Sequence, residues 1–354
     1  MKQKILVINT GSTSTKMALF VDGQKVYNGE VTHDQTELNR CENLADQYSY
    51  RKKMIEDEIK ANSLELTGLS AVAARGGTFG SVKGGAYLVN EALLDACRHP
   101  VTQHASNLSA IIAYDIAKEF GCDAYIYDAV CTDEVDDIAK VTGLSDIKRR
   151  AFSHTLNTRA VAMLQAEKMD RDYREMTFIV AHLGGGISVN IHKNGRIIDL
   201  VTDDEGAMSP ERAGKLNGKS YVDLCFSGKY DKKSMMKKIK GHGGLLDHLG
   251  TSDMREIEKR ICDGDEHARF VLEAMGYQLA KDIAALASVV HGKVDCIILT
   301  GGCANSRRLT RQVAGSVDWI APVSVIPGAM EMEALANGVA RVLDGKEQFR
   351  IFSK

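Results

Sequence analysis

The feature that most constrains the fold of this chain is an internal repeat. Residues 4–23 and residues 178–195 follow the same pattern: an apolar run, a glycine-containing polar turn, a second apolar run and a hairpin dipeptide. The dipeptides are Asp22-Gly23 and Asn194-Gly195, which are strong signals for a two-residue β-hairpin. A repeat of this length predicts two similar domains, each beginning with a three-stranded meander.

The turn between the first two runs is rich in glycine and hydroxyl groups in both copies. The first contains Gly11 among four hydroxyl residues, and the second reads Gly184-Gly185-Gly186-Ile187-Ser188. Such a turn offers backbone N–H and O–H donors of the kind that bind phosphate, although one such turn alone is commonly just a turn. Two of them in similar domains favour a nucleotide held in a cleft between the domains.

Composition indicates an ordinary globular protein. The chain has 354 residues, which suggests two domains, and its 45 Lys and Arg nearly balance its 47 Asp and Glu. This balance does not favour nucleic acid or an anionic membrane as a partner. No apolar run approaches the roughly 18 residues of a membrane span, and the eight cysteines form no C-x-x-C pair, so we expect a cytoplasmic protein without a zinc or dithiol centre.

The character of the sequence changes near residue 150, where we place the domain boundary. The expected N-terminal domain covers residues 1–150, with residues 328–354 packing back on it, and the C-terminal domain covers residues 151–327. Helices are expected at 38–62, 91–97, 108–120, 157–170, 267–291 and 330–343, and further strands at 69–74, 124–127, 294–299 and 323–326. Ser106 or Asn107 is expected to cap the third helix. The basic stretch 229–240 is interpreted as a solvated helix face.

This α/β arrangement, two duplicated domains of the ribonuclease H-like (actin-like ATPase) type, looks like that of sugar kinases, actin and the heat-shock ATPases. Where that superfamily usually has an Asp in the first turn, this chain has Asn9. A sugar kinase needs a carboxylate base, whereas a carboxylic acid substrate is already ionised at neutral pH and needs cations and hydrogen-bond donors instead. Arg75, His154 and His182 follow apolar runs or lie beside glycines, and they are candidates for these donors.

At this level of detail the sequence resembles the acetate and butyrate kinase family. Residues 9–16, NTGSTSTK, are similar to the family signature N-x-G-S-x-S-x-K, and residues 181–186, AHLGGG, match A-H-L-G-x-G. Further similarity lies at Arg75-Gly76-Gly77, His104 to Asn107, Asp128, Phe152 to His154, Thr300 to Gly302 and Ile326 to Glu331. The resemblance spans nearly the whole chain, and its wording and length are most similar to the butyrate kinase branch.

The resemblance implies a reversible, Mg²⁺-dependent transfer of phosphate from ATP to a short-chain fatty acid, butyrate or a branched C4–C5 acid, giving an acyl phosphate and ADP. Asn9, Ser12, Ser14 and Lys16 would surround the transferring phosphoryl group, and Arg75 would bind the carboxylate. His154 and His182 would donate to phosphoryl oxygens. Asp128 and Glu331, with Asn9, would position Mg²⁺. Gly184, Gly185 and Gly186 would pass near the β-phosphate, and Gly301, Gly302 and Asn305 would hold the adenosine.

Some alternatives stay open at this point. Acetate kinases carry a second arginine in an R-S-G motif, and here Arg212 or Lys215 is the candidate replacement. Glu333 is the alternative to Glu331. An acetate or propionate kinase, a sugar kinase and a non-catalytic ATP-binding regulator are the rival functions. The family also leads us to expect a homodimer or higher homo-oligomer.

Overall fold

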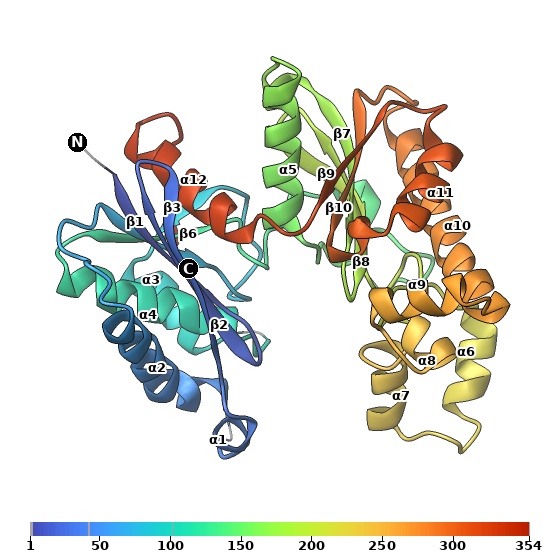
Figure 1. Ribbon diagram of the computed structural model, residues 1–354, viewed down its shortest axis with the longest axis horizontal. Coiled ribbons are helices and arrows are strands. Elements are labelled where there is room, and N and C mark those ends of the chain that lie inside the picture. Colours follow the sequence, from blue (N-terminus) through green and yellow to red (C-terminus); the bar gives the residue numbers. More distant parts are fainter. Residues whose placement is uncertain (1–2, 42, 101, 354) are drawn as a thin grey trace. The chain divides into compact units, whose positions relative to one another are not determined.

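The computed structural model describes residues 3–41, 43–100 and 102–353, and the chain divides into two compact units (Figure 1). Unit 1 consists of Met1–Asp133 and Met330–Lys354, and unit 2 consists of Glu134–Ala329. Residues 134–150, which the sequence analysis assigns to the N-terminal domain, make their contacts in unit 2. The Arg149 guanidinium, for example, pairs with Asp199 and Glu205.

Unit 1 is built on a seven-stranded mixed sheet in the order β12-β5-β6-β4-β1-β2-β3. The strands are β1 (Lys4–Thr10), β2 (Ser14–Val21), β3 (Gln24–Thr32), β4 (Ala71–Arg75), β5 (Ala86–Leu88), β6 (Asp123–Tyr127) and β12 (Arg350–Ile351). Strands β1, β2 and β3 form the antiparallel meander, and β4 and β6 continue the sheet in parallel with β1. The apolar runs of β1 and β4 are buried because helices cover the sheet.

The helices of unit 1 are α1 (Gln35–Asn39), α2 (Tyr48–Ala61), α3 (Glu91–Arg98), α4 (Ser106–Glu119) and α12 (Glu331–Leu343), with a short 3-10 helix, η1 (Leu44–Gln47). Helix α12 comes from the end of the chain and packs on β1, β4 and β6. Gly338 permits this close packing, because a Cβ there would lie 2.5 Å from the ring of Tyr127.

Unit 2 repeats the core of this arrangement in a five-stranded sheet of order β11-β10-β7-β8-β9. Its strands are β7 (Thr177–Leu183), β8 (Ile187–Lys193), β9 (Arg196–Val201), β10 (Cys296–Gly301) and β11 (Val323–Pro327). Again the first three strands form an antiparallel meander and the last two run parallel to the first. The predicted duplication is therefore present in the structure.

The helices of unit 2 include the 24-residue α10 (Glu266–Val289), which packs against α11 (Arg307–Val317) as Figure 1 shows. The others are α5 (Thr155–Lys168), α6 (Gly218–Cys225), α7 (Lys232–Ile239), α8 (Leu245–Leu249) and α9 (Met254–Cys262), with the short helices η2 (Asp137–Lys140), η3 (Tyr173–Glu175) and η4 (Gly302–Asn305). Helix α5 packs on β7 and β10. None of the described helices combines the length and apolarity that a bilayer span requires.

The two hairpins have the same backbone conformation. Asp22 and Gly23 have φ values of 50° and 76°, and Asn194 and Gly195 have φ values of 51° and 78°. Positive φ at both central residues is the mark of a type I′ turn, which Asn-Gly and Asp-Gly favour. A β-bulge precedes each turn, between Leu19 and Phe20 in β2 and between Ile191 and His192 in β8.

Two local predictions were wrong. The N-cap of α4 is Ala105, and both expected capping residues lie inside the helix. The Ser106 hydroxyl instead donates to the Thr10 carbonyl, and the Asn107 side-chain oxygen accepts from the Thr78 N–H. The helical spacing of apolar residues within 267–291 in the sequence also predicts Phe270 on the buried face of this helix, but its side chain in α10 is 68% exposed.

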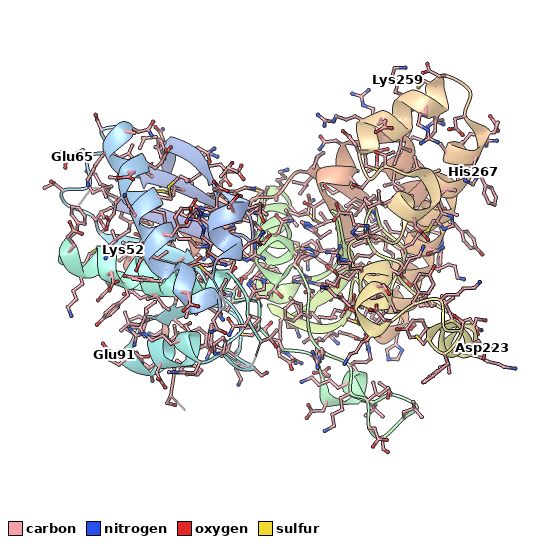
Figure 2. The ribbon with its side chains drawn as sticks, turned by 90° about the horizontal axis from the view of Figure 1, so that it is seen from below. Lys52, Glu65, Glu91, Asp223, Lys259 and His267 are labelled. Atoms are coloured by element: carbon pink, nitrogen blue, oxygen red, sulfur yellow. The ribbon has the colours of Figure 1, made fainter. Side chains whose placement is uncertain are left out.

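Charged side chains lie on the outside of both units. Figure 2 labels Glu65 and Glu91 in unit 1 and Asp223 and Lys259 in unit 2, and all four are exposed. The stretch predicted to be a solvated basic helix forms α7, of which only Met235 is buried.

Candidate active site

In unit 1, three of the predicted residues lie at the carboxyl ends of neighbouring parallel strands. Asn9 ends β1 with Thr10, Arg75 is the last residue of β4, and Asp128 directly follows β6. The strand register sets Arg75 opposite Tyr127, next to Asp128. The carboxyl edge of parallel strands is the usual ligand-binding edge of an open α/β sheet.

Glu331, the first residue of α12, joins two of these strand ends. One carboxylate oxygen accepts a hydrogen bond of 2.8 Å from the Asn9 amide, and the other accepts one of 2.7 Å from the Arg75 guanidinium. Asn9 is 5% exposed, and the side chains of Arg75 and Glu331 are each 20% exposed. Glu333, the alternative carboxylate, forms an ion pair with Lys25 instead. The geometry therefore favours Glu331 over Glu333 as the site carboxylate.

Asp128 has a left-handed backbone with φ of 42°, which is uncommon outside glycine. Its backbone N–H donates to the Gly85 carbonyl, and its side-chain oxygen accepts from the Gly85 N–H at 2.8 Å. This reciprocal pair fixes a buried carboxylate at the strand end. Positive φ at a non-glycine residue held in this way is a common mark of a functional position.

The first glycine turn connects the end of β1 to the start of β2, so it lies at the same end of these strands as Asn9. Ser12 and Lys16 are exposed, and the register sets Lys16 opposite Asn9. The Ser14 hydroxyl donates to Glu30 at 2.6 Å. Ser14 would therefore have to leave Glu30 in order to donate to a phosphate, whereas among the described residues no such partner holds the side chain of the exposed Ser12.

His104 precedes α4 in unit 1 and lies close enough to Arg75 to be affected by its charge. Burial, and then the positive charge of Arg75, lower the pKa of His104 to about 4. The imidazole is therefore neutral at physiological pH, and Arg75 is the permanent cation of the two.

In unit 2, the two predicted histidines lie together. The rings of His154 and His182 are stacked, with centroids 4.0 Å apart and planes 13° from parallel. His182 ends β7 with Leu183, and His154 is the N-cap residue of α5. The Nδ1 atom of His154 is 2.9 Å from the Ser188 hydroxyl.

Asn157, on the first turn of α5, orients His182. Its amide nitrogen is 2.9 Å from Nδ1 of His182 and also contacts the Thr300 hydroxyl. Because an amide nitrogen donates, Nδ1 accepts and the neutral ring carries its proton on Nε2. The sequence pattern identifies Asn157 only as the start of an expected helix. Its spacing from His182 and Thr300 in the sequence contains no signal of this contact.

The glycine turn of unit 2 is held through its carbonyl groups. The Gly185 carbonyl accepts from the Ser209 hydroxyl at 2.6 Å and from the Glu211 N–H at 3.0 Å, and the Gly184 N–H donates to the Gly186 carbonyl. A Cβ at Gly186 would lie 2.8 Å from a carboxylate oxygen of Asp203. The turn is therefore packed tightly between acidic side chains.

Arg212 and Lys215, the two candidate second cations, have different surroundings. Arg212 pairs with Asp203 and Glu211, the same carboxylates that lie against the glycine turn. Lys215 pairs at 3.1 Å with the buried Asp282 of α10. The contacts therefore place Arg212, rather than Lys215, beside the turn.

The predicted adenosine segment leads from β10 into η4. Gly301 has φ of 91°, and a Cβ there would lie 2.4 Å from the Leu183 carbonyl oxygen. Asn305 donates to the Gly302 carbonyl at 2.8 Å. A hollow of about 260 Å³ opens beside it, and its lining residues are Glu258, Cys262, Asn305, Arg307 and Arg308.

Metal ligands do not gather into a ready-made site. Within residues 3–41, 43–100 and 102–353, no three His, Cys, Asp or Glu side chains converge in a way that would hold a metal ion. Asp128 and Glu331 supply carboxylate oxygens in unit 1, which suits Mg²⁺ better as the counter-ion of a bound phosphate than as a metal held by protein ligands alone.

Two comparisons of the sequence with known proteins give matches. A model of the Acetokinase family matches residues 138–321. The chain is 45% identical over 351 residues to Butyrate kinase 2 of Clostridium acetobutylicum, covering 98% of this chain and 99% of that protein.

Solved structures show the same fold. The acetate kinase of Porphyromonas gingivalis superimposes with a TM-score of 0.78 at 20% identity, covering 96% of this chain and 99% of that chain. A propionate kinase from Francisella tularensis gives a TM-score of 0.74 at 17% identity, covering 94% and 98%. These structures confirm the expected fold class. The family model and the 45% identical relative confirm the family resemblance and the enzyme class: the protein is a nucleotide-using carboxylate kinase. The chain belongs to the Acetokinase family.

Proposed function

We propose that the protein is a butyrate kinase, which transfers the terminal phosphate of ATP reversibly to butyrate or a branched C4–C5 acid. The similarity to Butyrate kinase 2 over 98% of the chain supports this substrate class. One structural observation carries the chemistry. The strand ends of the two units present the hydrogen-bond donors Asn9, Arg75 and His182, and Asn9 stands where a hydroxyl kinase of this fold usually has an aspartate. Donors suit an acceptor that is already an anion.

In unit 1, Arg75 would bind the substrate carboxylate. Its guanidinium is a permanent cation, and its present partner, Glu331, is a side chain that a carboxylate substrate would replace as hydrogen-bond acceptor. Asn9, Ser12, Ser14 and Lys16 would contact the transferring phosphoryl group. The exposed Ser12 and Lys16 are available for this without rearrangement, and Ser14 would first release Glu30.

In unit 2, His182 would donate from Nε2 to a phosphoryl oxygen, since Asn157 holds Nδ1 as an acceptor. His154, stacked on His182, would be a second donor. Gly184, Gly185 and Gly186 would approach the β-phosphate, and Gly301, Gly302 and Asn305 would hold the adenosine beside the 260 Å³ hollow. Arg212 would be the second cation, because its carboxylate partners flank the glycine turn.

Mg²⁺ would be held by Asp128 and Glu331, with the side-chain oxygen of Asn9, and would supply charge neutralisation on the phosphates. The residues of the chain would orient the carboxylate and the phosphoryl group for in-line attack. The bond between the γ-phosphorus and its bridging oxygen breaks as a carboxylate oxygen bonds to phosphorus, and no proton has to be removed from the acid. A homo-oligomeric assembly and a cytoplasmic location are proposals from the family only.

Trapping with hydroxylamine tests this function. The purified protein with MgATP is offered acetate, propionate, butyrate, isobutyrate, valerate and isovalerate, and the acyl hydroxamate is measured. We expect a maximum at butyrate or a branched neighbour. A maximum at acetate or propionate would keep the enzyme class and replace the substrate. The absence of any hydroxamate from a protein that still binds ATP would contradict the proposal and favour a regulatory role.

A further inference from the structure

Three successive carbonyl groups of the first glycine turn accept hydrogen bonds from buried residues of unit 1. The Gly11 and Ser12 carbonyls accept hydrogen bonds of 2.9 and 2.8 Å from the two terminal nitrogens of Arg51. The Thr13 carbonyl accepts from the His33 N–H at 2.9 Å. These three hydrogen bonds fix the backbone of an exposed turn.

Arg51 is a fully buried residue of α2, with no exposed surface. Its Nε atom donates to the Gln47 side chain at 3.0 Å, so all three nitrogens have acceptors. Within the described part of the chain it forms no ion pair. The next residue, Lys52, labelled in Figure 2, is by contrast close to two carboxylates, Glu56 and Asp115. Burial of a cation without a counter-charge is costly, and a neutral side chain would be enough to satisfy two carbonyls.

The anchored carbonyls fix the direction of two N–H groups. In a trans peptide the C=O and the N–H of the same unit point in opposite directions. The carbonyl of Gly11 shares its peptide with the N–H of Ser12, and the carbonyl of Ser12 shares its peptide with the N–H of Thr13. Because Arg51 holds both carbonyls inward, both N–H groups point outward. Neither N–H donates to a protein acceptor among the described residues, and both residues are exposed.

We propose that the backbone N–H groups of Ser12 and Thr13 bind oxygens of the transferring phosphoryl group, and that Arg51 is the positioning residue that aims them. The proposal rests on the kinase function proposed above and adds three groups to its phosphoryl site. Two adjacent, preorganised N–H donors with a permanent cation behind them form the type of anion site that stabilises developing negative charge.

The second glycine turn is a useful internal comparison. There the Gly185 carbonyl is held by the neutral Ser209 hydroxyl and the Glu211 N–H. A turn of this type can therefore be anchored without a cation. The buried guanidinium of Arg51 instead contacts the turn that carries Ser12. A cation at this position would stabilise a bound phosphoryl group as well as the backbone of the turn.

The test compares two conservative changes of buried arginines, R51K and R159K. Arg159 is 7% exposed and donates to the Gly195 carbonyl and to Glu134 in unit 2, whereas the turn belongs to unit 1. A lysine at position 51 keeps the charge but replaces the guanidinium fork by a single nitrogen. We expect R51K to lower kcat about 100- to 1,000-fold, the usual range for loss of an oxyanion donor, with unchanged ADP affinity, and R159K to leave kcat within twofold.

A second variant separates positioning from stability. In R51A, guanidinium ion at millimolar concentration should restore kcat at least tenfold, while urea, which has a similar shape but no charge, should not. Equal losses of kcat in R51K and R159K that follow their unfolding temperatures, with no rescue by guanidinium, would overturn the proposal.

A measurement on the unchanged protein covers the case in which Arg51 variants do not fold. With ¹⁵N-labelled serine and threonine, addition of butyryl phosphate without ADP should shift the amide proton signals of Ser12 and Thr13 downfield and leave those of Ser63 and Thr67 in place. Unmoved signals in a protein that forms acyl hydroxamate would reject the role of these amides while leaving the kinase function intact. A protein that forms no hydroxamate would reject the kinase function itself.

Discussion

Asn9 of β1 and His182 of β7 occupy the same position in the two repeats. Each is the sixth residue of a seven-residue strand. Each lies opposite a residue of the following strand, Lys16 for Asn9 and Ser188 for His182, in meanders that end in matching hairpins. The duplication has therefore placed an amide and an imidazole, both hydrogen-bond donors, at equivalent strand ends.

The partners of these two residues are also equivalent. Glu331, at the start of α12, contacts Asn9 and the end of β4 at Arg75, and Asn157, on the first turn of α5, contacts His182 and the end of β10 at Thr300. The strand registers make Arg75 and Thr300 counterparts. In each unit, a helix that begins over the strand ends supplies the side chain that orients the donor. In unit 1 this side chain is the carboxylate of Glu331, which suits the cation of Arg75 and a metal ion. In unit 2 it is the amide of Asn157, which sets the tautomer of His182.

The first prediction concerns that tautomer. In the variant N157D, an acceptor faces Nδ1 of His182, so the ring proton moves to Nδ1 and Nε2 loses its donor hydrogen. We expect kcat to fall about 10²- to 10⁴-fold, the range typical of a lost proton donor, with ADP affinity retained. Side-chain ¹⁵N shifts of His182 report the tautomer directly. Unchanged kcat in a variant whose Nε2 is shown to be unprotonated would remove His182 from the reaction.

The sequence predicts those features of the fold that depend on residues adjacent in the chain. The hairpins at Asp22-Gly23 and Asn194-Gly195 were predicted because their φ values depend on those two residues. The capping residues of α4 were predicted wrongly because a tertiary contact captured each side chain: the Thr10 carbonyl holds Ser106, and the Thr78 N–H binds Asn107.

The same distinction applies to the candidate site. The glycine turns and the strand-end residues could be found because they carry motifs. Asn157 and Arg51 could not be found in this way, because their hydrogen-bond partners are distant in the sequence. The tertiary fold creates these contacts, and no short motif records them. The choice between Glu331 and Glu333 also required the structure, since it depends on which side of α12 faces β1 and β4.

A second prediction follows from the charge of Arg75 beside His104. R75A should abolish most acyl phosphate formation while ATP binding is retained, because the carboxylate loses its cation. The same change should raise the pKa of His104 from about 4, but not to its ordinary value of 6.5, because burial is the larger cause of the shift. R75K, which keeps the charge, is the control. NMR titration of His104 measures the pKa, and a value unaffected by R75A would show that the charge does not act on this ring.

A third prediction compares two adjacent glycines of the proposed adenosine segment. G301A combines a positive φ with a backbone clash at 2.4 Å, so it should lower the free energy of unfolding by at least about 2 kcal/mol. G302A meets no atom within 4 Å and should unfold at the temperature of the parent protein. If Gly302 contacts the nucleotide, the added methyl group should weaken ADP binding several-fold even though G302A is as stable as the parent protein. Calorimetry measures the ADP affinity. Normal ADP affinity in G302A would move the nucleotide away from this residue.

A fourth prediction distinguishes the candidate second cations. R212A should lower kcat/KM about 10- to 100-fold, because Arg212 shares its carboxylate partners with the glycine turn. K215A should keep kcat/KM within twofold and instead lose about 1 kcal/mol of stability, since Lys215 is mostly exposed and its loss removes the partner of the buried Asp282. Hydroxamate assays and urea unfolding measure both quantities. The reverse pattern would assign the role to Lys215.

The last prediction concerns stability against pH and depends on His33, a buried neighbour of Arg51. Its Nε2 atom is 2.8 Å from the Thr15 hydroxyl, and burial, followed by the charge of Arg51, lowers its pKa from 6.5 to about 4. Between these two values the unfolded chain binds a proton that the folded chain does not. The stabilisation from neutral His33 is therefore complete above pH 6.5, and it is lost as the pH falls toward 4, by at most about 3 kcal/mol.

H33Q should reduce the slope of the unfolding free energy against pH between pH 4.5 and 6.5, by an amount that corresponds to at most one bound proton. Urea titration at fixed pH values measures this slope. His104 remains in this variant and keeps its own contribution, so a residual slope is expected, whereas a slope identical to that of the parent protein would exclude His33 as a source of acid sensitivity.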